Sequence, residues 1–421
     1  LGYGELGCYG QEKIKTPNLD RLAAEGMRFT QFYAGSTVCA PSRATLMTGL
    51  HTGHAFIRGN EQLPLRPQDL TVAEVLKGAG YKTAIFGKWG LGKEGTTGVP
   101  NQKGFDEWLG YLDQVEAHNY YPETLWRNSQ RFAFPGNMNH QKSDYSHNWF
   151  TRAATNFIET YYDKPLFLYL AYTIPHANNE LGQVTKNGME VPSDAPYTNE
   201  PWPQTEKNKA AMITLMDRDI GRIVEVLQAR KLERDTLVIF TSDNGPHKEG
   251  GANPAFFKSA GPLRGIKRDL YEGGIRVPFI AWWPGHIKPG SVSDSVGAFW
   301  DFLPTAAELA KAKPPEQTDG ISLVPVLLGE EPKQRHDFLY WEFHENGSKQ
   351  AVRMGDWKAV RLEPGKPLEL YNLKNDASET NNIAASQPAI VARIEGYLKT
   401  ARTESETWPL KSPPPPKTVN P

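Results

Sequence analysis

The sequence is poor in cysteine and has almost no net charge, and both facts narrow the class of protein. Only Cys8 and Cys39 occur among 421 residues, which excludes a framework of disulfide bonds. Lys and Arg number 47 and Asp and Glu 48, a net charge of −1, so no overall field attracts nucleic acid or an acidic membrane. No apolar run is long enough to cross a bilayer. We therefore expect no nucleic-acid partner, no membrane span, and only local recognition of anions.

Short apolar strands alternate with helices through most of the chain. A length of 421 residues suggests two or three domains. The expected strands are apolar on both faces and the expected helices carry apolar residues at helical spacing. The strands cover residues 27–34, 82–86, 165–172, 236–241 and 277–283, and the long helices 146–162 and 204–230. This alternation is typical of an α/β fold with a mostly parallel sheet sandwiched by helices.

The pattern changes after about Leu328. Short strands joined by Gly and Pro turns are followed by one helix at residues 389–400. The strands are expected at residues 335–342, 350–354, 357–362 and 368–373. We therefore predict a smaller C-terminal subdomain, an antiparallel sheet plus a helix, over residues 329–412. A Pro-rich tail, residues 413–421, follows it.

Polar side chains come directly after three of the expected strands. Lys88, His176 and the pair Asp243-Asn244 each follow an apolar strand. In an open α/β sheet, ligands bind at the carboxyl ends of the strands. The sequence therefore predicts that an ammonium group, an imidazole and a carboxylate meet at one edge of the sheet.

Residues 38–49, Val-Cys-Ala-Pro-Ser-Arg-Ala-Thr-Leu-Met-Thr-Gly, place a cysteine just ahead of an expected helix. Pro41 suits the first helical position and Gly49 suits the end. The helix dipole favours a negative charge at Cys39, and Arg43 adds a cation that can bind an oxyanion. By itself this pattern indicates an activated residue facing an anion, and a buried structural cysteine is the alternative.

Cys39-Ala40-Pro41-Ser42-Arg43, with its continuation to Gly49, resembles the signature of the type I, formylglycine-dependent sulfatases, which are arylsulfatase-like members of the alkaline phosphatase superfamily. The resemblance implies hydrolysis of a sulfate ester, with a sulfated saccharide as the expected substrate. The nucleophile would be a formylglycine hydrate that a maturation enzyme generates from Cys39. The resemblance also implies a periplasmic or secreted location. On the same basis we assign residues 1–328 to the catalytic domain.

The same resemblance gives a role to each polar residue at the expected edge. Arg43 would orient the hydrate, and Lys88, within Gly87-Lys88-Trp89-Gly90, would hold the sulfate. His176 would contact the sulfate or protonate the leaving oxygen, and Lys267 would stand beside the bridging oxygen. The predicted catalytic residues are therefore Cys39, Arg43, Lys88, His176 and Lys267. Glu272 and Arg276 are expected to brace a loop.

Asp243-Asn244-Gly245 is similar to the metal-binding D-N-G of the family. Oxygen donors suit a hard divalent cation, and we expect Ca²⁺, with Mg²⁺ as the alternative. The predicted ligands are Asp243, Asn244 and the modified Cys39. Sulfatases usually open with an apolar strand that ends in two Asp residues, and this sequence lacks both. We therefore expect that the first strand of the catalytic domain is missing here.

The sequence departs from the family pattern at Gly90, where relatives carry a His associated with the hydrate. His54, His118 and His247 are candidates for that task, and the sequence does not choose among them. For substrate contacts we name Arg58, His118, Trp126 and His247, although core packing explains each of them singly as well.

Two other functions stay open at this point. A phosphatase or phosphonate esterase of the same superfamily is one, although such enzymes with an unmodified nucleophile carry Ser or Thr where Cys39 stands. A non-catalytic glycan-binding relative is the other, because of Gly90 and the absent Asp pair.

Overall fold

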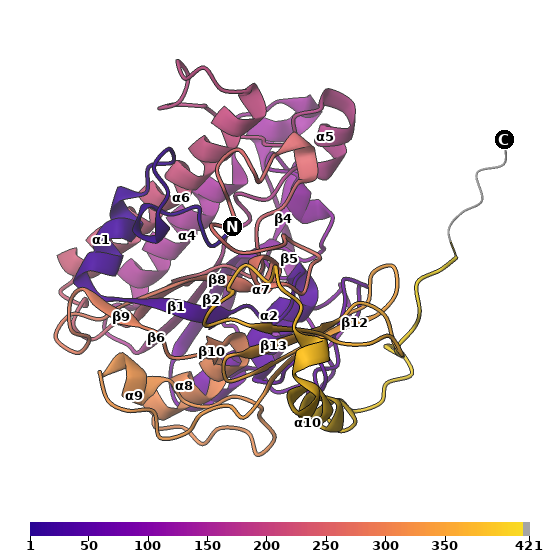
Figure 1. Cartoon of the computed structure of the whole chain (residues 1–421). Coiled ribbons are helices and arrows are strands. Elements are labelled where there is room, and N and C mark those ends of the chain that lie inside the picture. Colours follow the sequence, from indigo (N-terminus) through magenta and orange to yellow (C-terminus); the bar gives the residue numbers. More distant parts are fainter. Residues whose placement is uncertain (416–421) are drawn as a thin grey trace.

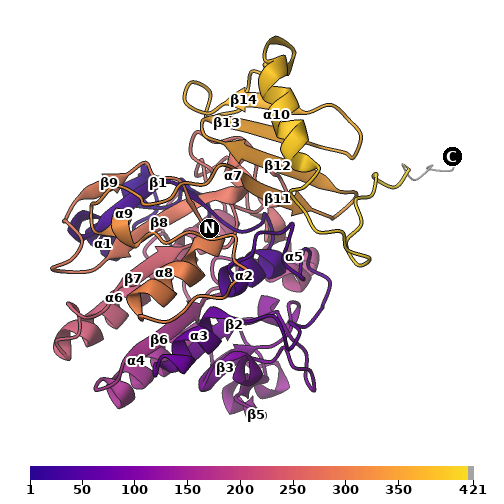
Figure 2. The same ribbon diagram turned by 90° about the horizontal axis from the view of Figure 1, so that it is seen from below.

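The computed structural model describes residues 1–415, so residues 416–421 of the predicted tail lie outside the described part. The larger part of the molecule is built from two five-stranded sheets flanked by helices. A separate four-stranded sheet with one helix forms the C-terminal part (Figure 1, Figure 2). The predicted α/β class, with a smaller antiparallel C-terminal sheet, is confirmed.

The first sheet is centred on β2 (Lys82–Lys88), which pairs in parallel with both of its neighbours. In sheet order its strands are β5 (Gln130–Ala133), β4 (Thr124–Arg127), β3 (Glu107–Tyr111), β2 and β6 (Leu166–Ala171). Parallel pairing of β2 with β6 brings their carboxyl ends to the same edge. Lys88, the last residue of β2, therefore lies near the segment that follows β6.

The second sheet is centred on β1 (Met27–Tyr33) and β8 (Arg276–Trp282), which run antiparallel. Its remaining strands are β10 (Gly297–Ala298), β9 (Ser291–Ser293) and β7 (Val238–Thr241). β7 is also antiparallel to β8, while β9 and β10 are parallel to β1. Strand pairing is therefore parallel around β2 and mixed over the two sheets together.

β6 and β7 are edge strands among the described residues, which corrects the expectation that both are buried on both faces. All four residues of β7, and all of β6 except Ala171, are partly exposed. Figure 2 shows β6 and β7 as neighbouring strands where the edges of the two sheets meet. Leu168 and Val238 pack against the same hydrophobic cluster. Apolar composition thus identified both strands but not their edge position.

Helices cover both sides of the sheets (Figure 1). On one side α1, α4 and α6 pack together, and on the other α2, α3 and α8 do so. The bounds are α1 (Pro17–Glu25), α2 (Cys39–Thr48), α3 (Val72–Gly78), α4 (Ser146–Tyr161), α5 (Asn179–Thr185), α6 (Gln204–Ala229), α7 (Glu272–Ile275), α8 (Phe302–Leu309) and α9 (Val324–Leu327). Within residues 1–415, no helix has both the length and the apolar character needed to cross a membrane.

The C-terminal sheet is antiparallel throughout, in the order β11 (Leu339–Phe343), β12 (Lys349–Met354), β13 (Trp357–Arg361) and β14 (Glu369–Asn372). The helix α10 (Pro388–Leu398) buries Ile394 and Leu398 against it. A buried charge cluster ties this sheet to the larger part. Lys358 Nζ, fully buried, donates to Glu272 Oε1 at 3.0 Å and to Glu379 Oε1 at 3.3 Å. Glu272 thus braces its loop, as expected.

Replacing Lys358 with Met should destabilise the protein strongly. The change leaves buried Glu379 without its cation and leaves Glu272 with Arg276 alone, which costs about 3–5 kcal/mol of unfolding free energy. Urea denaturation followed by fluorescence measures this loss. The matched control is Lys366→Met at an exposed position, where we expect a change within about 0.5 kcal/mol. Equal midpoints for the two variants would show that the cluster does not hold the sheets together.

Candidate active site

Cys39 is the first residue of α2, so the helix begins two residues earlier than the sequence predicted. The Cys39 residue is 5% exposed and Arg43, one turn later, is 6% exposed. Asn60 Oδ1 accepts a hydrogen bond from the Ala40 N–H at 3.0 Å, which satisfies one free amide of the first turn. At the other end Gly49 adopts a left-handed conformation and closes the helix. The cysteine is therefore held rigidly at a helix N-terminus.

Arg43 connects three segments that are far apart in the sequence. Its Nη1 donates to the backbone oxygen of Lys88 at 2.6 Å. Its Nε and Nη2 donate to Asp243 Oδ2 at 3.1 and 3.0 Å. Burial would raise the pKa of Asp243, but Arg43 holds it below its ordinary value. One guanidinium therefore joins α2 to the ends of β2 and β7.

The loop that carries Lys267 is bound to both neighbouring segments. The Lys267 N–H donates to Pro246 O at 2.9 Å, and the Arg268 N–H donates to Thr37 Oγ1 at 2.9 Å. His247 Nε2 lies 2.8 Å from the carbonyl oxygen of Pro175. These contacts connect the loop, the turn after β7, the residues before Cys39 and the segment after β6.

The pKa of Lys88 responds to the charges of several predicted catalytic residues, which means that they lie close to it. Burial lowers the pKa of Lys88, and the charges of Arg43 and Lys267 lower it further. The charges of Cys39 and Asp243 oppose this shift. The structure therefore brings these residues to one place, as the sequence predicted, while their roles in catalysis stay predictions.

His176 lies in the same place and contacts Lys267 directly. Lys267 Nζ is 3.1 Å from His176 Nε2 and 2.8 Å from Glu249 Oε2. His176 Nδ1 lies 2.8 Å from the carbonyl oxygen of Ala177. A carbonyl oxygen only accepts, so the ring hydrogen is on Nδ1 and Nε2 accepts from Lys267.

Three imidazole rings are stacked at the site. His118 and His176 have ring centroids 4.9 Å apart and planes within 7°, and His247 lies 5.6 Å away on His176. His118 Nδ1 is 3.2 Å from both carboxylate oxygens of Glu180. Two of the predicted substrate contacts, His118 and His247, thus lie at the site.

Asp243 and Asn244 fit a hard cation in chemical type. Both are oxygen-bearing residues after β7, and Asn244 is 6% exposed. Asn244 Nδ2 donates to Asp243 Oδ1 at 2.7 Å, which fixes both side chains. Ca²⁺ takes about six to eight oxygen ligands, so these two residues are part of a site rather than a complete one.

A second group of metal-ligating residue types lies elsewhere. Ligand atoms of His51, His54 and Asp319 are within 4.8 Å of one another. His54 Nδ1 donates to Asp319 Oδ1 at 2.8 Å, and the Gly53 N–H donates to His51 Nδ1 at 3.1 Å. His51 Nε2 therefore carries a hydrogen and offers no lone pair. We interpret this group as a hydrogen-bonded cluster. The Nδ1 of His54, one of the three histidines considered for the role of the His absent at Gly90, is hydrogen-bonded to Asp319 in it.

Gln114 occupies the space beside Gly90. Gly90 has φ of +76°, and a Cβ there would lie 2.1 Å from Gln114 Nε2. Gln114 Nε2 donates to the Gly90 carbonyl at 3.1 Å. Position 90, where the family resemblance leads us to expect a His, therefore has no room for a side chain unless Gln114 moves.

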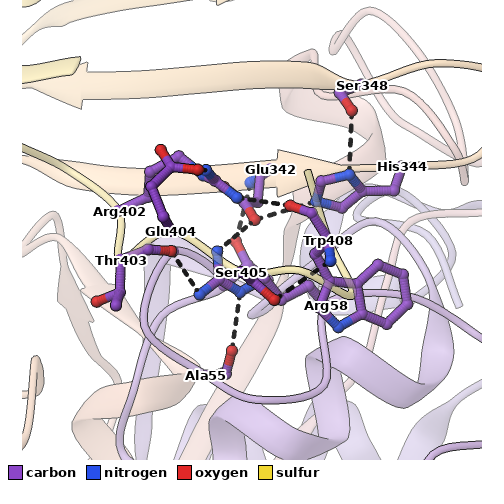
Figure 3. A network of polar contacts seen from close by, with 12 residues as sticks. Ala55, Arg58, Glu342, His344, Ser348, Arg402, Thr403, Glu404, Ser405 and Trp408 are labelled. Carbon is purple, nitrogen blue, oxygen red and sulfur yellow. Dashed lines mark hydrogen bonds and ion pairs between the residues drawn. The ribbon is translucent and has the colours of Figure 1, made fainter. Parts of the chain in front are cut away.

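Arg58 and Trp126 are placed differently from the sequence prediction. Arg58 is 3% exposed and donates to Glu342 Oε1 at 2.9 Å, to Ala55 O and to Thr403 O, within a network that Figure 3 shows. Trp126 is 7% exposed and packs in a hydrophobic cluster. Arg58 donates to groups inside the protein and Trp126 packs in the core, which favours the core-packing interpretation of both.

Glu249, Asn60 and Gln114 are residues of the site that the sequence did not reveal. Asn60 contacts the first turn of α2, and Glu249 pairs with Lys267. The only sequence signal was position, since Glu249 follows His247 by two residues in the turn after β7. Nothing in the spacing of Gln114 relates it to Gly90.

The comparisons with known proteins agree on one family. A family model described as Sulfatase matches residues 1–312, and one described as N-sulphoglucosamine sulphohydrolase, C-terminal, matches residues 266–404. N-acetylgalactosamine-6-sulfatase of Sus scrofa is 34% identical over 391 residues, 85% of this chain and 69% of that protein. Arylsulfatase A of Homo sapiens is 32% identical over 460 residues, 95% and 84%. The crystal structure of Ps i-CgsB in complex with k-i-k-neocarrahexaose has a TM-score of 0.83 and 28% identity, covering 98% and 93%.

Replacing Gly90 with Ala should lower the melting temperature, because the new Cβ clashes with Gln114 and the positive φ is strained. We expect a cost of about 1–3 kcal/mol. The double variant with Gln114→Ala relieves the clash and should recover part of the loss. Gly78→Ala, where a Cβ meets nothing within 4 Å, is the control and should be neutral or stabilising. An unchanged melting temperature for Gly90→Ala would contradict this steric argument.

Proposed function

The chain belongs to the sulfatase family, whose members are sulfuric ester hydrolases, and from this premise we propose that it hydrolyses sulfate esters of a saccharide through a formylglycine hydrate made from Cys39. One observation carries the proposal. Four buried residues, Cys39, Arg43, Lys88 and Lys267, influence one another electrostatically, and the partly exposed His176 contacts Lys267.

The names of the relatives support a carbohydrate substrate. N-acetylgalactosamine-6-sulfatase is named for a sugar sulfate, and the structure of Ps i-CgsB was solved with a neocarrahexaose. These substrates are properties of those proteins. For this chain we propose the class, a sulfated saccharide, without choosing the sugar or the sulfated position.

The buried cations suit a sulfate ester. The sulfate carries one negative charge, and more charge develops on the leaving oxygen as the bond to sulfur breaks. Lys88 and Lys267, 3% and 6% exposed, are cations in a place shielded from water, where their attraction for an anion is strong. Arg43, fixed by Asp243, holds the start of α2 in place.

Cys39 is placed where an oxygen nucleophile would benefit from the helix N-terminus. The formylglycine modification supplies a hydrate oxygen that attacks sulfur and a route for releasing sulfate. A dedicated maturation enzyme is the implied partner. The family resemblance also leads us to propose a periplasmic or secreted location.

A divalent cation is proposed at Asp243 and Asn244, together with the modified Cys39. It would neutralise charge on the sulfate and orient it. Ca²⁺ is our choice, with Mg²⁺ as the alternative.

Among the substrate contacts predicted from the sequence, His118 and His247 remain proposals. His118 lies close enough to Lys88 and Lys267 to be affected by their charges. Burial lowers the pKa of His118, and these two charges lower it further. His247 is 5% exposed and bonded to the backbone, so its proposed contribution is to hold the wall of the site. No particular contact favours phosphate esters or mere glycan binding.

The proposal is tested by turnover on defined esters. With the maturation enzyme coexpressed, the chain should hydrolyse sulfated saccharides and an aryl sulfate, and act far more slowly on the phosphate ester of the same phenol. Cys39→Ser should reduce multiple turnover by roughly 10³-fold or more, since the releasing route is lost. Mass spectrometry of the Cys39 peptide checks for the aldehyde. Turnover of the phosphate ester alone, or an unmodified Cys39 with full activity, would reject the proposal.

Removing divalent cations should lower activity by at least about tenfold, since a bound cation supplies several kcal/mol of charge stabilisation. The measurement is sulfate release after dialysis against a chelator, followed by addition of Ca²⁺ or Mg²⁺. Asp243→Asn should weaken the response to added Ca²⁺. Full activity after dialysis, with metal content below stoichiometry, would contradict the metal assignment.

A further inference from the structure

Glu249 lies among the basic side chains of the site. It begins the short turn η5 (Glu249–Gly251), and its side chain is 17% exposed. Its Oε2 accepts a hydrogen bond from Lys267 at 2.8 Å and lies 3.8 Å from His176 Nε2. Its Oε1 pairs with Arg268. Glu249 and His176 therefore both contact Lys267 Nζ and lie next to each other.

The two histidines beside Glu249 are neutral, so the cations that this carboxylate binds are the buried Lys267 and the more exposed Arg268. His176 carries its hydrogen on Nδ1, which faces a backbone carbonyl at 2.8 Å. His247 carries its hydrogen on Nε2, which also faces a carbonyl at 2.8 Å, and its Nδ1 accepts from the Glu249 N–H at 3.2 Å. The proton available to a leaving oxygen is thus one that Lys267 and His176 share.

The groups around Lys267 and His176 disfavour protonation of the His176 ring to its cationic form. Burial, and then the charges of Lys267 and Lys88, lower the pKa of His176 well below its usual range, and His247 and His118 act in the same direction. The charged and titratable groups that face the pair come from four segments: Lys88 at the end of β2, His118 in the turn Glu116–His118, His247 and Glu249 after β7, and Arg268 beside Lys267. Glu180 of α5 contacts His118.

Glu249 provides a negative charge against this positive field. Burial would raise the pKa of Glu249, but the charge of Lys267 and the hydrogen bonds from Lys267 and Arg268 lower it to about 2, so the carboxylate is ionised near neutral pH. Its contacts also fix Lys267 Nζ within hydrogen-bond reach of His176.

We propose that Glu249 is a positioning residue that keeps the Lys267–His176 pair protonated and aimed at the leaving oxygen of the substrate. This inference rests on the proposed function. As the oxygen nucleophile of the proposed function bonds to sulfur, the bond between sulfur and the sugar oxygen breaks and its electrons stay on the sugar oxygen. That oxygen then takes one proton from the Lys267–His176 pair. The pair regains that proton from water. Glu249 touches none of the reacting atoms.

The test is the pH dependence of kcat/KM for Glu249→Gln, which keeps the shape of the side chain and removes its charge. Without the carboxylate the cationic form of the pair is less stable, so its proton is lost at lower pH. The alkaline limb should move down by about one to two pH units. The loss of rate should be at least about tenfold greater for a saccharide sulfate than for a nitrophenyl sulfate, whose leaving group needs no proton.

Glu345→Gln is the matched control. Glu345, in the turn between β11 and β12, accepts a hydrogen bond from the same Arg268 through its Oε2 at 2.6 Å. This variant should keep the alkaline limb of the wild type. Glu249→Asp, which retains the charge with a shorter reach, should move the limb in the same direction by a smaller amount, and it serves if Glu249→Gln does not fold.

The outcomes separate the two proposals. A wild-type chain that hydrolyses no sulfate ester refutes the proposed function. An active wild type, with an unmoved alkaline limb and equal losses on both substrates in either Glu249 variant, overturns the role of Glu249. Identical shifts in Glu345→Gln would also overturn it, since they would reflect the bracing of Arg268.

Discussion

The guanidinium of Arg43 is the interaction on which the arrangement of the site depends. It bonds the end of β2 through the Lys88 carbonyl and the turn after β7 through Asp243. Arg43 lies on the same helix as Cys39, so the nucleophile is fixed relative to both strand ends. A planar donor group with several N–H directions can hold two segments at once, which an ammonium group does less well.

Arg43 also adds to the electrostatic repulsion between the buried cations of the site. Arg43, Lys88 and Lys267 are all buried close together, and burial of like charges is costly without carboxylates nearby. Asp243 balances Arg43, and Glu249 balances Lys267. An anionic substrate would reduce the remaining repulsion, so the cluster favours a bound sulfate group.

Much of the site was predictable because its chemistry lies in short contiguous patterns. The segment from Cys39 to Arg43, the Asp243-Asn244 turn and the residues after the strands could each be identified locally. Their meeting at one place followed from the α/β pattern, since the strand ends share an edge. Arg58 and Trp126 could not be assigned in this way, because their surroundings come from distant parts of the chain.

The sequence by itself determined the fold class, the family and the residues around Cys39, because strand periodicity and a contiguous motif are properties of neighbouring positions. Only the tertiary structure decided that Gln114 fills the space at Gly90, that β6 and β7 are edge strands, and that Glu249 binds Lys267. Each of these depends on a contact between segments distant in sequence. Such contacts depend on how whole helices and strands pack against each other, so they cannot be predicted from the pattern of neighbouring residues in the sequence.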